Sequence, residues 1–289
     1  MTPSRLLARA ALTAWLLAGS GCSLALKTDA EQCTVDADCA ARGAAFANTV
    51  CTANVCQPKQ VTMTDPKWGC IGDVKPLPTG GMATFKIQLL DLIQATPITS
   101  NVTIKLCSKY DPTCSSPLGT PSPDAMGWVS GQVASDFEGY LDVTDTTGNY
   151  IPALVFIDLV AVGKNTDILL VPKSTEGGLA MNAMVTVDPV GALLLTRTVD
   201  CTETRSAGVS VSMSPSSKET GFYVINNALV TTATQTDSAG NAGFINIAAP
   251  STVTVTGSVS ATGKEMGKVT TLVRPGGMTY QVVRPTANP

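Results

Sequence analysis

The sequence contains no histidine, and this absence excludes several kinds of chemistry. Without an imidazole the chain has no Ser-His-Asp or Cys-His arrangement and no histidine ligand for zinc. Other catalytic motifs are missing as well: there is no Gly-x-Ser-x-Gly, no Ser-x-x-Lys, no Gly-x4-Gly-Lys phosphate loop and no EF-hand loop. We therefore expect a protein that is not an enzyme and that carries no cofactor and no metal.

Charged and aromatic residues are scarce too, at 14% and 5% of the chain. The 19 Lys and Arg residues form no cluster, and 22 Asp and Glu residues bring the formal net charge to −3. Because such a surface cannot neutralise a run of phosphates, we expect no nucleic-acid partner. Low charge combined with many β-branched residues also argues against a long disordered region.

The chain begins with a segment typical of export signals. Arg5 and Arg9 accompany the nine-residue stretch 10–18 (AALTAWLLA), which is too short to span a bilayer. We predict that residues 1–21 are a signal peptide that does not belong to the fold.

The four residues Gly19-Ser20-Gly21-Cys22 resemble the lipobox of bacterial lipoproteins, although Gly19 stands where that family usually has Leu. The resemblance implies that Cys22 is lipidated and anchors the protein to a membrane, and Ser23 resembles lipoproteins of the outer membrane. The cysteine count agrees, because nine is odd and lipidation of Cys22 leaves eight. The alternative is an ordinary secretory signal cleaved a few residues later.

Residues 22–66 are predicted to form a lipid-anchored tether and a cysteine-rich neck containing Cys33, Cys39, Cys51 and Cys56. A segment this short buries little apolar surface, so two disulfides are expected to hold it, with three possible connectivities. A zinc site is disfavoured because no C-x2-C pairs are present. Gln32-Cys33, Asp38-Cys39 and the closing Cys-x4-Cys resemble small modules of predicted myxobacterial surface lipoproteins.

From residue 71 onward, apolar and polar residues alternate as they do in half-buried strands. We predict an all-β protein in which two tandem Ig/transthyretin-like β-sandwiches, residues 67–188 and 189–289, follow the signal peptide and neck. A faint repeat supports two copies of one fold a little over a hundred residues apart. In this comparison the run 154–157 corresponds to the strand around Val253.

The second copy has a more specific likeness. Gly208-Val209-Ser210-Val211, the run from Thr236-Asp237 to Phe244, then Asn246-Ile247 and Val253-Thr254-Val255 resemble carboxypeptidase-regulatory-like modules, which are transthyretin-like sandwiches. Ala249-Pro250-Ser251 replaces the usual Pro-x-Gly turn of that family. The resemblance implies a scaffold or a binding accessory.

Four cysteines remain: Cys70, Cys107, Cys114 and Cys201. Because Asp111-Pro112 favours a turn between them, a local Cys107–Cys114 bridge is the first choice, which leaves Cys70 for Cys201. The stretch 174–184 breaks the β pattern, and we predict a short helix that plugs the end of the first sandwich.

The predicted function is that of a lipid-anchored protein of the bacterial outer membrane or cell surface, with a non-catalytic binding or structural role. Its partners would be the membrane and an envelope protein or polysaccharide, bound by loops, unless it is only a spacer. The alternative is a carbohydrate-active or other hydrolase with paired carboxylates, for which Asp142 with Asp145, or Asp36 with Asp38, are candidates. We favour turn roles for these acids, and core or seam packing for Trp68 and Trp128.

Overall fold

A computed structural model describes residues 32–43, 46, 49–58, 66–73, 80–157, 166–182 and 184–286. The chain divides into two compact units, Met1–Thr62 and Met63–Pro289, which are described separately below. The predicted signal peptide and Cys22 lie outside the described residues. Within the described ranges, no helix has both the length and the apolar character needed to cross a membrane.

The first unit is a small cross-linked motif. It contains α1 (Asp36–Ala40) and the antiparallel hairpin of β1 (Thr49–Thr52) and β2 (Val55–Pro58). Two disulfides, Cys33–Cys51 and Cys39–Cys56, hold the segment before and within α1 against the hairpin. The structure thus selects one of the three connectivities that the sequence allowed. Covalent links of this kind replace the hydrophobic core that so short a segment lacks.

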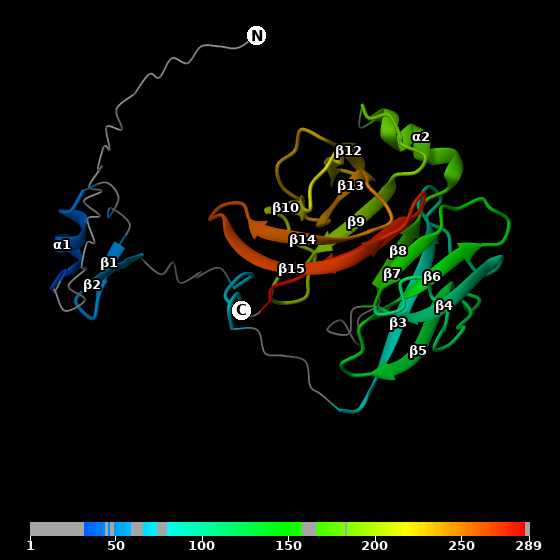
Figure 1. Ribbon diagram of the computed structural model, residues 1–289, viewed down its shortest axis with the longest axis horizontal. Coiled ribbons are helices and arrows are strands. Elements are labelled where there is room, and N and C mark those ends of the chain that lie inside the picture. Colours follow the sequence, from blue (N-terminus) through cyan, green and yellow to red (C-terminus); the bar gives the residue numbers. More distant parts are fainter. Residues whose placement is uncertain are drawn as a thin grey trace, which may run out of the picture. The chain divides into compact units, whose positions relative to one another are not determined.

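The second unit is built almost entirely of strands (Figure 1). In chain order its elements are β3 (Met82–Asp91), β4 (Val102–Ser108), β5 (Trp128–Ala134), β6 (Gly139–Asp145), β7 (Ala153–Phe156), β8 (Thr166–Leu170), α2 (Lys173–Asn182), β9 (Ala192–Thr198), β10 (Val209–Ser214), β11 (Thr220–Ile225), β12 (Ala228–Val230), β13 (Asn241–Ile247), β14 (Ser251–Val259), β15 (Lys264–Val273) and β16 (Met278–Val283).

These strands form two repeats of one topology. The first repeat has the strand sets β5-β3-β8 and β4-β6-β7, and the second has β13-β9-β16 and β10-β14-β15. In the first repeat β3 is antiparallel to β5 and parallel to β8; in the second, β9 is likewise antiparallel to β13 and parallel to β16. Corresponding strands begin a little over a hundred residues apart, which agrees with the repeat seen in the sequence.

One detail of the predicted repeat is wrong. The topology matches β14, which contains Val253, to β6, whereas the sequence comparison had matched it to the run 154–157, which includes β7. The reason is physical: short alternating strands resemble one another, and the pairing partners that distinguish them lie far away in the sequence. The second repeat also has an extra hairpin, β11–β12, paired with the outer edge of β13.

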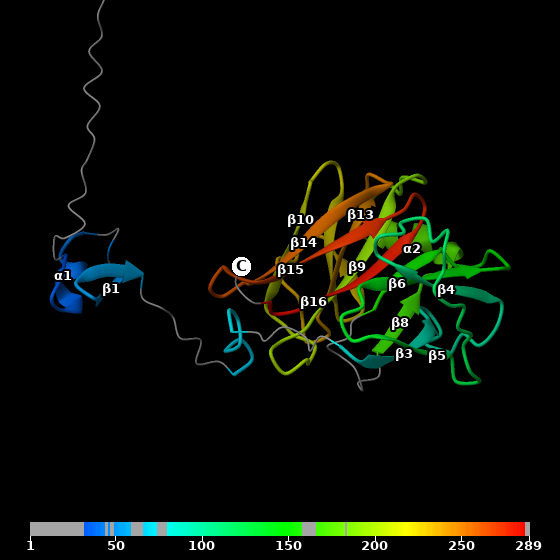
Figure 2. The same cartoon turned by 60° about the horizontal axis from the view of Figure 1, so that its bottom comes forward.

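The two repeats share a sheet. The last strand, β16, lies parallel to β9 of its own repeat and parallel to β7 of the first repeat, which produces one eight-stranded sheet (Figures 1 and 2). All six residues of β16 are buried. Met278, Tyr280 and Val282 pack into the core of the first repeat, while Val283 packs into the core of the second. A central parallel strand covered on both faces has this burial pattern.

The predicted helix is present as α2, Lys173–Asn182, but it does not have the expected position. It follows β8 of the first repeat and contacts β12 of the second repeat. It therefore does not simply plug the end of the first sandwich.

Candidate binding site

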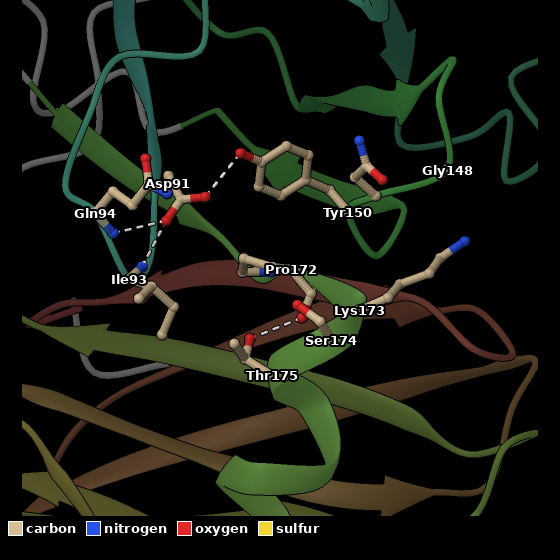
Figure 3. A pocket seen from close by; sticks show the side chains of 10 residues that line it. Asp91, Ile93, Gln94, Gly148, Tyr150, Pro172, Lys173, Ser174 and Thr175 are labelled. Atoms are coloured by element: carbon tan, nitrogen blue, oxygen red, sulfur yellow. Dashed lines mark hydrogen bonds between the residues drawn. The ribbon is translucent and has the colours of Figure 1, made fainter.

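A pocket of about 390 Å³ lies where the end of β3, the turn after β6 and the start of α2 meet (Figure 3). Asp91 and Gln94 line one side, Asn149 and Tyr150 another, and the first turn of α2 closes it. The segments approach one another because Tyr150 and Pro172 form an isolated β-bridge and the Lys173 N–H donates to the Asn149 carbonyl at 2.8 Å.

Asp91 is buried in the wall of this pocket, and both of its carboxylate oxygens accept hydrogen bonds. One carboxylate oxygen accepts the N–H groups of Ile93 and Gln94, each at 2.7 Å, and the other accepts the Tyr150 hydroxyl at 2.7 Å. Burial alone would raise the pKa of Asp91, but these hydrogen bonds outweigh it and lower the pKa. Burial together with the bond to Asp91 raises the pKa of Tyr150 to about 12.

The turn that carries Asn149 and Tyr150 is organised by Asp145. Its carboxylate accepts the N–H of Thr147 at 2.9 Å, the N–H of Tyr150 at 3.1 Å and the N–H of Asn149. These bonds outweigh the effect of burial and lower the pKa of Asp145. Asp145 therefore holds one wall of the pocket in place.

The opposite side of the pocket is polar and carries a positive charge. The exposed Lys173 extends toward Gly148 and away from Asp91, and Ser174 and Thr175 follow it in the first turn of α2 (Figure 3). Among the lining residues Asp91 is the only carboxylate, and both of its oxygens already accept hydrogen bonds. The arrangement can bind a polar molecule by hydrogen bonds, and it lacks the two free carboxylates that glycoside hydrolysis requires.

The acids singled out in the sequence do not form catalytic pairs. Asp142 forms an ion pair with Arg274 at 2.7 Å, whereas Asp145 caps its own turn. In the first unit, Asp36 accepts the Cys51 N–H at 2.8 Å and Asp38 accepts the Thr34 N–H at 2.7 Å. Carboxylates that accept N–H groups of their own turn recur at Asp111, Asp124, Asp200 and Asp237. The turn role expected for these acids is thus correct for Asp145 and Asp38. It is wrong for Asp142, which lies on β6 and pairs with Arg274, and for Asp36, which bonds to β1.

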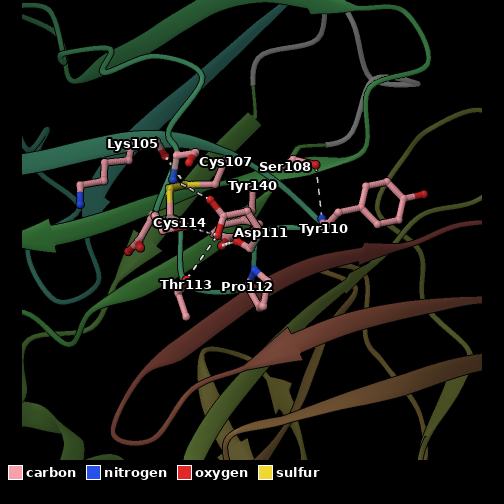
Figure 4. The surroundings of a disulfide bond; sticks show 12 residues. Lys105, Cys107, Ser108, Tyr110, Asp111, Pro112, Thr113, Cys114 and Tyr140 are labelled. Carbon is pink, nitrogen blue, oxygen red and sulfur yellow. Dashed lines mark hydrogen bonds between the residues drawn. A yellow bond between two sulfur atoms is a disulfide. The ribbon is translucent and has the colours of Figure 1, made fainter.

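The disulfide Cys107–Cys114 closes a loop next to Tyr140 (Figure 4). A residue of the second repeat holds this loop in place. Arg274, which follows β15, donates from its guanidinium to the Pro112 carbonyl at 2.7 Å and to the Tyr140 hydroxyl at 3.0 Å. The Tyr140 hydroxyl in turn donates to the Asp111 carbonyl. No local pattern in the sequence predicts this network, because Arg274 lies more than 150 residues from the loop.

The Cys70–Cys201 disulfide, with a Cα–Cα distance of 5.7 Å, fixes the segment 66–73 to the second repeat. Trp68 and Ile71 pack into the core of that repeat, and the Cys201 N–H donates to the Lys67 carbonyl at 2.9 Å. The sequence had assigned this segment to the start of the first sandwich. Trp128, in contrast, lies on β5 of the first repeat with the Lys86 ammonium 4.6 Å from its ring.

The structure defines an all-β protein with two fused sandwich repeats and a disulfide-rich N-terminal unit. No protein-family model and no curated protein matches the chain. Among solved structures, shaft pilin SpaA from Lactobacillus rhamnosus GG matches with a TM-score of 0.23 and 13% identity, covering 72% of this chain and all of that one. BcpA, the major pilin subunit of Bacillus cereus, matches with a TM-score of 0.24 and 8% identity, covering 71% and 69%. At these scores we draw no function from either.

Proposed function

We propose that the protein is a lipid-anchored bacterial cell-surface protein with a non-catalytic structural role. The observation that carries the proposal is the joint between the repeats, where β16 belongs to a sheet shared by both and the Cys70–Cys201 disulfide secures the N-terminal side. A sheet shared in this way resists hinge motion, because bending it would break backbone hydrogen bonds between β16 and β7. In this proposal the second unit is a stiff body, and the cross-linked neck precedes it in the chain.

The anchor is assigned to Cys22, and the disulfides support this assignment. The other eight cysteines pair with one another in four bridges, so Cys22 is the one cysteine without a partner in the chain. Disulfides persist in oxidising compartments outside the cytoplasm, which fits an exported protein. Ser23, which follows Cys22, resembles the residue at this position in lipoproteins of the outer membrane and supports a location there. We retain the likeness of the second repeat to carboxypeptidase-regulatory-like modules as part of this proposal.

Mass spectrometry of the mature protein without reduction tests the anchor directly. We expect the mass of an acylated N-terminal Cys22 with eight cysteines oxidised, and we expect Cys22→Ser to move the protein from the membrane fraction to the soluble fraction. A mature N-terminus elsewhere, or an unmodified Cys22 thiol, would refute the lipid anchor.

The pocket favours a second candidate function, the binding of a polar envelope ligand such as a polysaccharide. Its lining combines an ammonium group, two amides and hydroxyl groups around the hydrogen-bonded Asp91–Tyr150 pair. A pull-down with envelope polysaccharide tests this function, comparing the wild-type protein with Lys173→Ala and, as a control outside the pocket, Lys268→Ala. Equal retention of both variants and the wild type would reject the pocket as the binding site.

A further inference from the structure

The sheets of the second unit end in edge strands, and the described part of the chain shows how most of these edges are protected. The edges are β4, β5, β8, β10, β12 and β15. Unpaired N–H and C=O groups along such an edge form a template for another strand, and proteins block them with charges, short strands or covering segments.

Loop segments and ion pairs cover three of these edges. On β4, Leu106 exchanges backbone hydrogen bonds of 2.8 Å with Leu118 and Gly119. On β8, Asp167 is ion-paired with Arg205 at 2.6 Å. On β15, which carries three charged residues, the Thr286 N–H donates to the Met266 carbonyl at 3.0 Å.

Two further edges are also unsuited to pairing. On β10, the Val211 N–H donates to the Tyr223 hydroxyl at 3.0 Å, so a side chain already occupies that position. The other edge, β12, is only three residues long.

Strand β5, Trp128–Ala134, has such contacts only at its two ends: Asp124 bonds to the N–H and the C=O of Trp128, and the Phe137 N–H donates to the Ala134 carbonyl. Between these ends, the described residues place none of these devices on Ser130 or Gln132. The strand's sequence WVSGQVA contains no charge and no proline, and its register with β3 runs through seven consecutive pairs without a bulge. Ser130 and Gln132 are exposed.

The backbone groups of these two residues aim away from β3. On either side of them, the Gly127 carbonyl accepts the Leu89 N–H at 2.9 Å and the Ser135 N–H donates to the Gly81 carbonyl at 3.1 Å. The backbone N–H and C=O groups of the odd-numbered residues of β5 therefore point toward β3. Alternation along an antiparallel strand directs the N–H and C=O groups of Ser130 and Gln132 to the open edge.

The second repeat shows that the fold accepts a strand at this position. The counterpart of β5 is β13, and its outer edge is paired antiparallel with β11 through Thr220–Tyr223. The first repeat has no such hairpin among its described residues. The same edge is thus occupied in one repeat and open in the other.

We propose that β5 pairs antiparallel with β5 of a second copy of this chain. A twofold axis at Gly131 places Ser130 opposite the partner's Gln132, and Gln132 opposite the partner's Ser130, so that each outward N–H meets a C=O. The closest facing pair is then two glycines, which have no side chains to collide. A uniform, uncharged edge is self-complementary, as a twofold interface requires. The pairing joins the sheets β8-β3-β5 of two molecules into one.

Sedimentation equilibrium of the full mature chain tests the pairing, with Cys22→Ser in every variant so that no acyl group drives association. The proposal therefore does not depend on the lipid anchor. We expect a concentration-dependent dimer. The double variant Ser130→Lys/Gln132→Lys places like charges opposite each other and is expected to lower the association constant by about tenfold.

The matched variant Ser130→Glu/Gln132→Lys places opposite charges face to face and is expected to restore the dimer. Thr103→Lys, an exposed position on β4, serves as the control and should associate as the parent does. Circular dichroism verifies the fold of each variant. A monomer at every concentration up to about 1 mM, or a dimer that tolerates the like charges, would overturn the proposal.

Discussion

At the scale of single residues, the aspartates of this protein mainly organise turns. Asp91, Asp111 and Asp145 each accept N–H groups from residues that follow them closely in the chain. The sequence predicts this role for Asp145 and, through the Asp111-Pro112 turn, for Asp111. What the sequence could not indicate is which turns meet, and the pocket between Asp91, Tyr150 and α2 depends on that.

Arg274 is the residue whose removal should be most informative. Its guanidinium bonds to Pro112, Tyr140 and Asp142 join the first repeat to the segment after β15. We expect Arg274→Ala to lower the free energy of unfolding by about 1–3 kcal/mol, because it leaves Asp142 and the Pro112 carbonyl without their partner. Urea denaturation measures the loss. Lys268→Ala, on an exposed part of β15, should change stability little, and an equal loss in both would show that the network contributes nothing.

At the scale of elements, two disulfides of the second unit differ in the length of chain that they close. Cys107–Cys114 closes a loop with a sequence separation of 7, and Cys70–Cys201 one of 131. Both pairings follow from the sequence, the first by its turn and the second by elimination. That Trp68 and Ile71 belong to the core of the second repeat does not follow from the sequence, because the chain enters the first repeat only after this segment.

The loop lengths predict unequal effects of removing the two bridges. In the chain-entropy account, Cys107→Ser/Cys114→Ser should cost about 2 kcal/mol and Cys70→Ser/Cys201→Ser about 5 kcal/mol, because the longer loop restricts the unfolded chain more. Guanidinium denaturation of the two double variants measures both values. A larger loss for the short loop would show that native contacts, such as those of Arg274, outweigh chain entropy.

At the scale of the whole molecule, the shared sheet couples the two repeats. If β16 were removed from the sheet, the cores of both repeats would lose residues at once, since Tyr280 lies in one and Val283 in the other. We therefore expect residues 63–289 to unfold in a single transition. Calorimetry checks this: the calorimetric and van't Hoff enthalpies should agree, whereas two resolved transitions would mean that the repeats are independent.

The carboxylates also predict how stability depends on pH. The pKa values of Asp91, Asp145 and Asp167 are lowered in the fold, because hydrogen bonds or neighbouring arginines outweigh the effect of burial. The unfolded chain therefore binds protons more readily than the fold below about pH 4. Stability should be complete above that value and should fall as the pH drops through the lowered pKa values. Denaturation midpoints between pH 7 and pH 2 test this; a constant midpoint would contradict it.

The sequence by itself determined the alternation that makes strands, the number of repeats and the supply of cysteines. These features are local, since two- to five-residue patterns and residue counts carry them. The tertiary structure decided the connectivity of the neck, the insertion of β16 between β9 and β7, the position of residues 66–73 and the pocket. Each of these depends on which distant segments pack and exchange backbone hydrogen bonds, and such contacts leave no signature in the neighbouring residues.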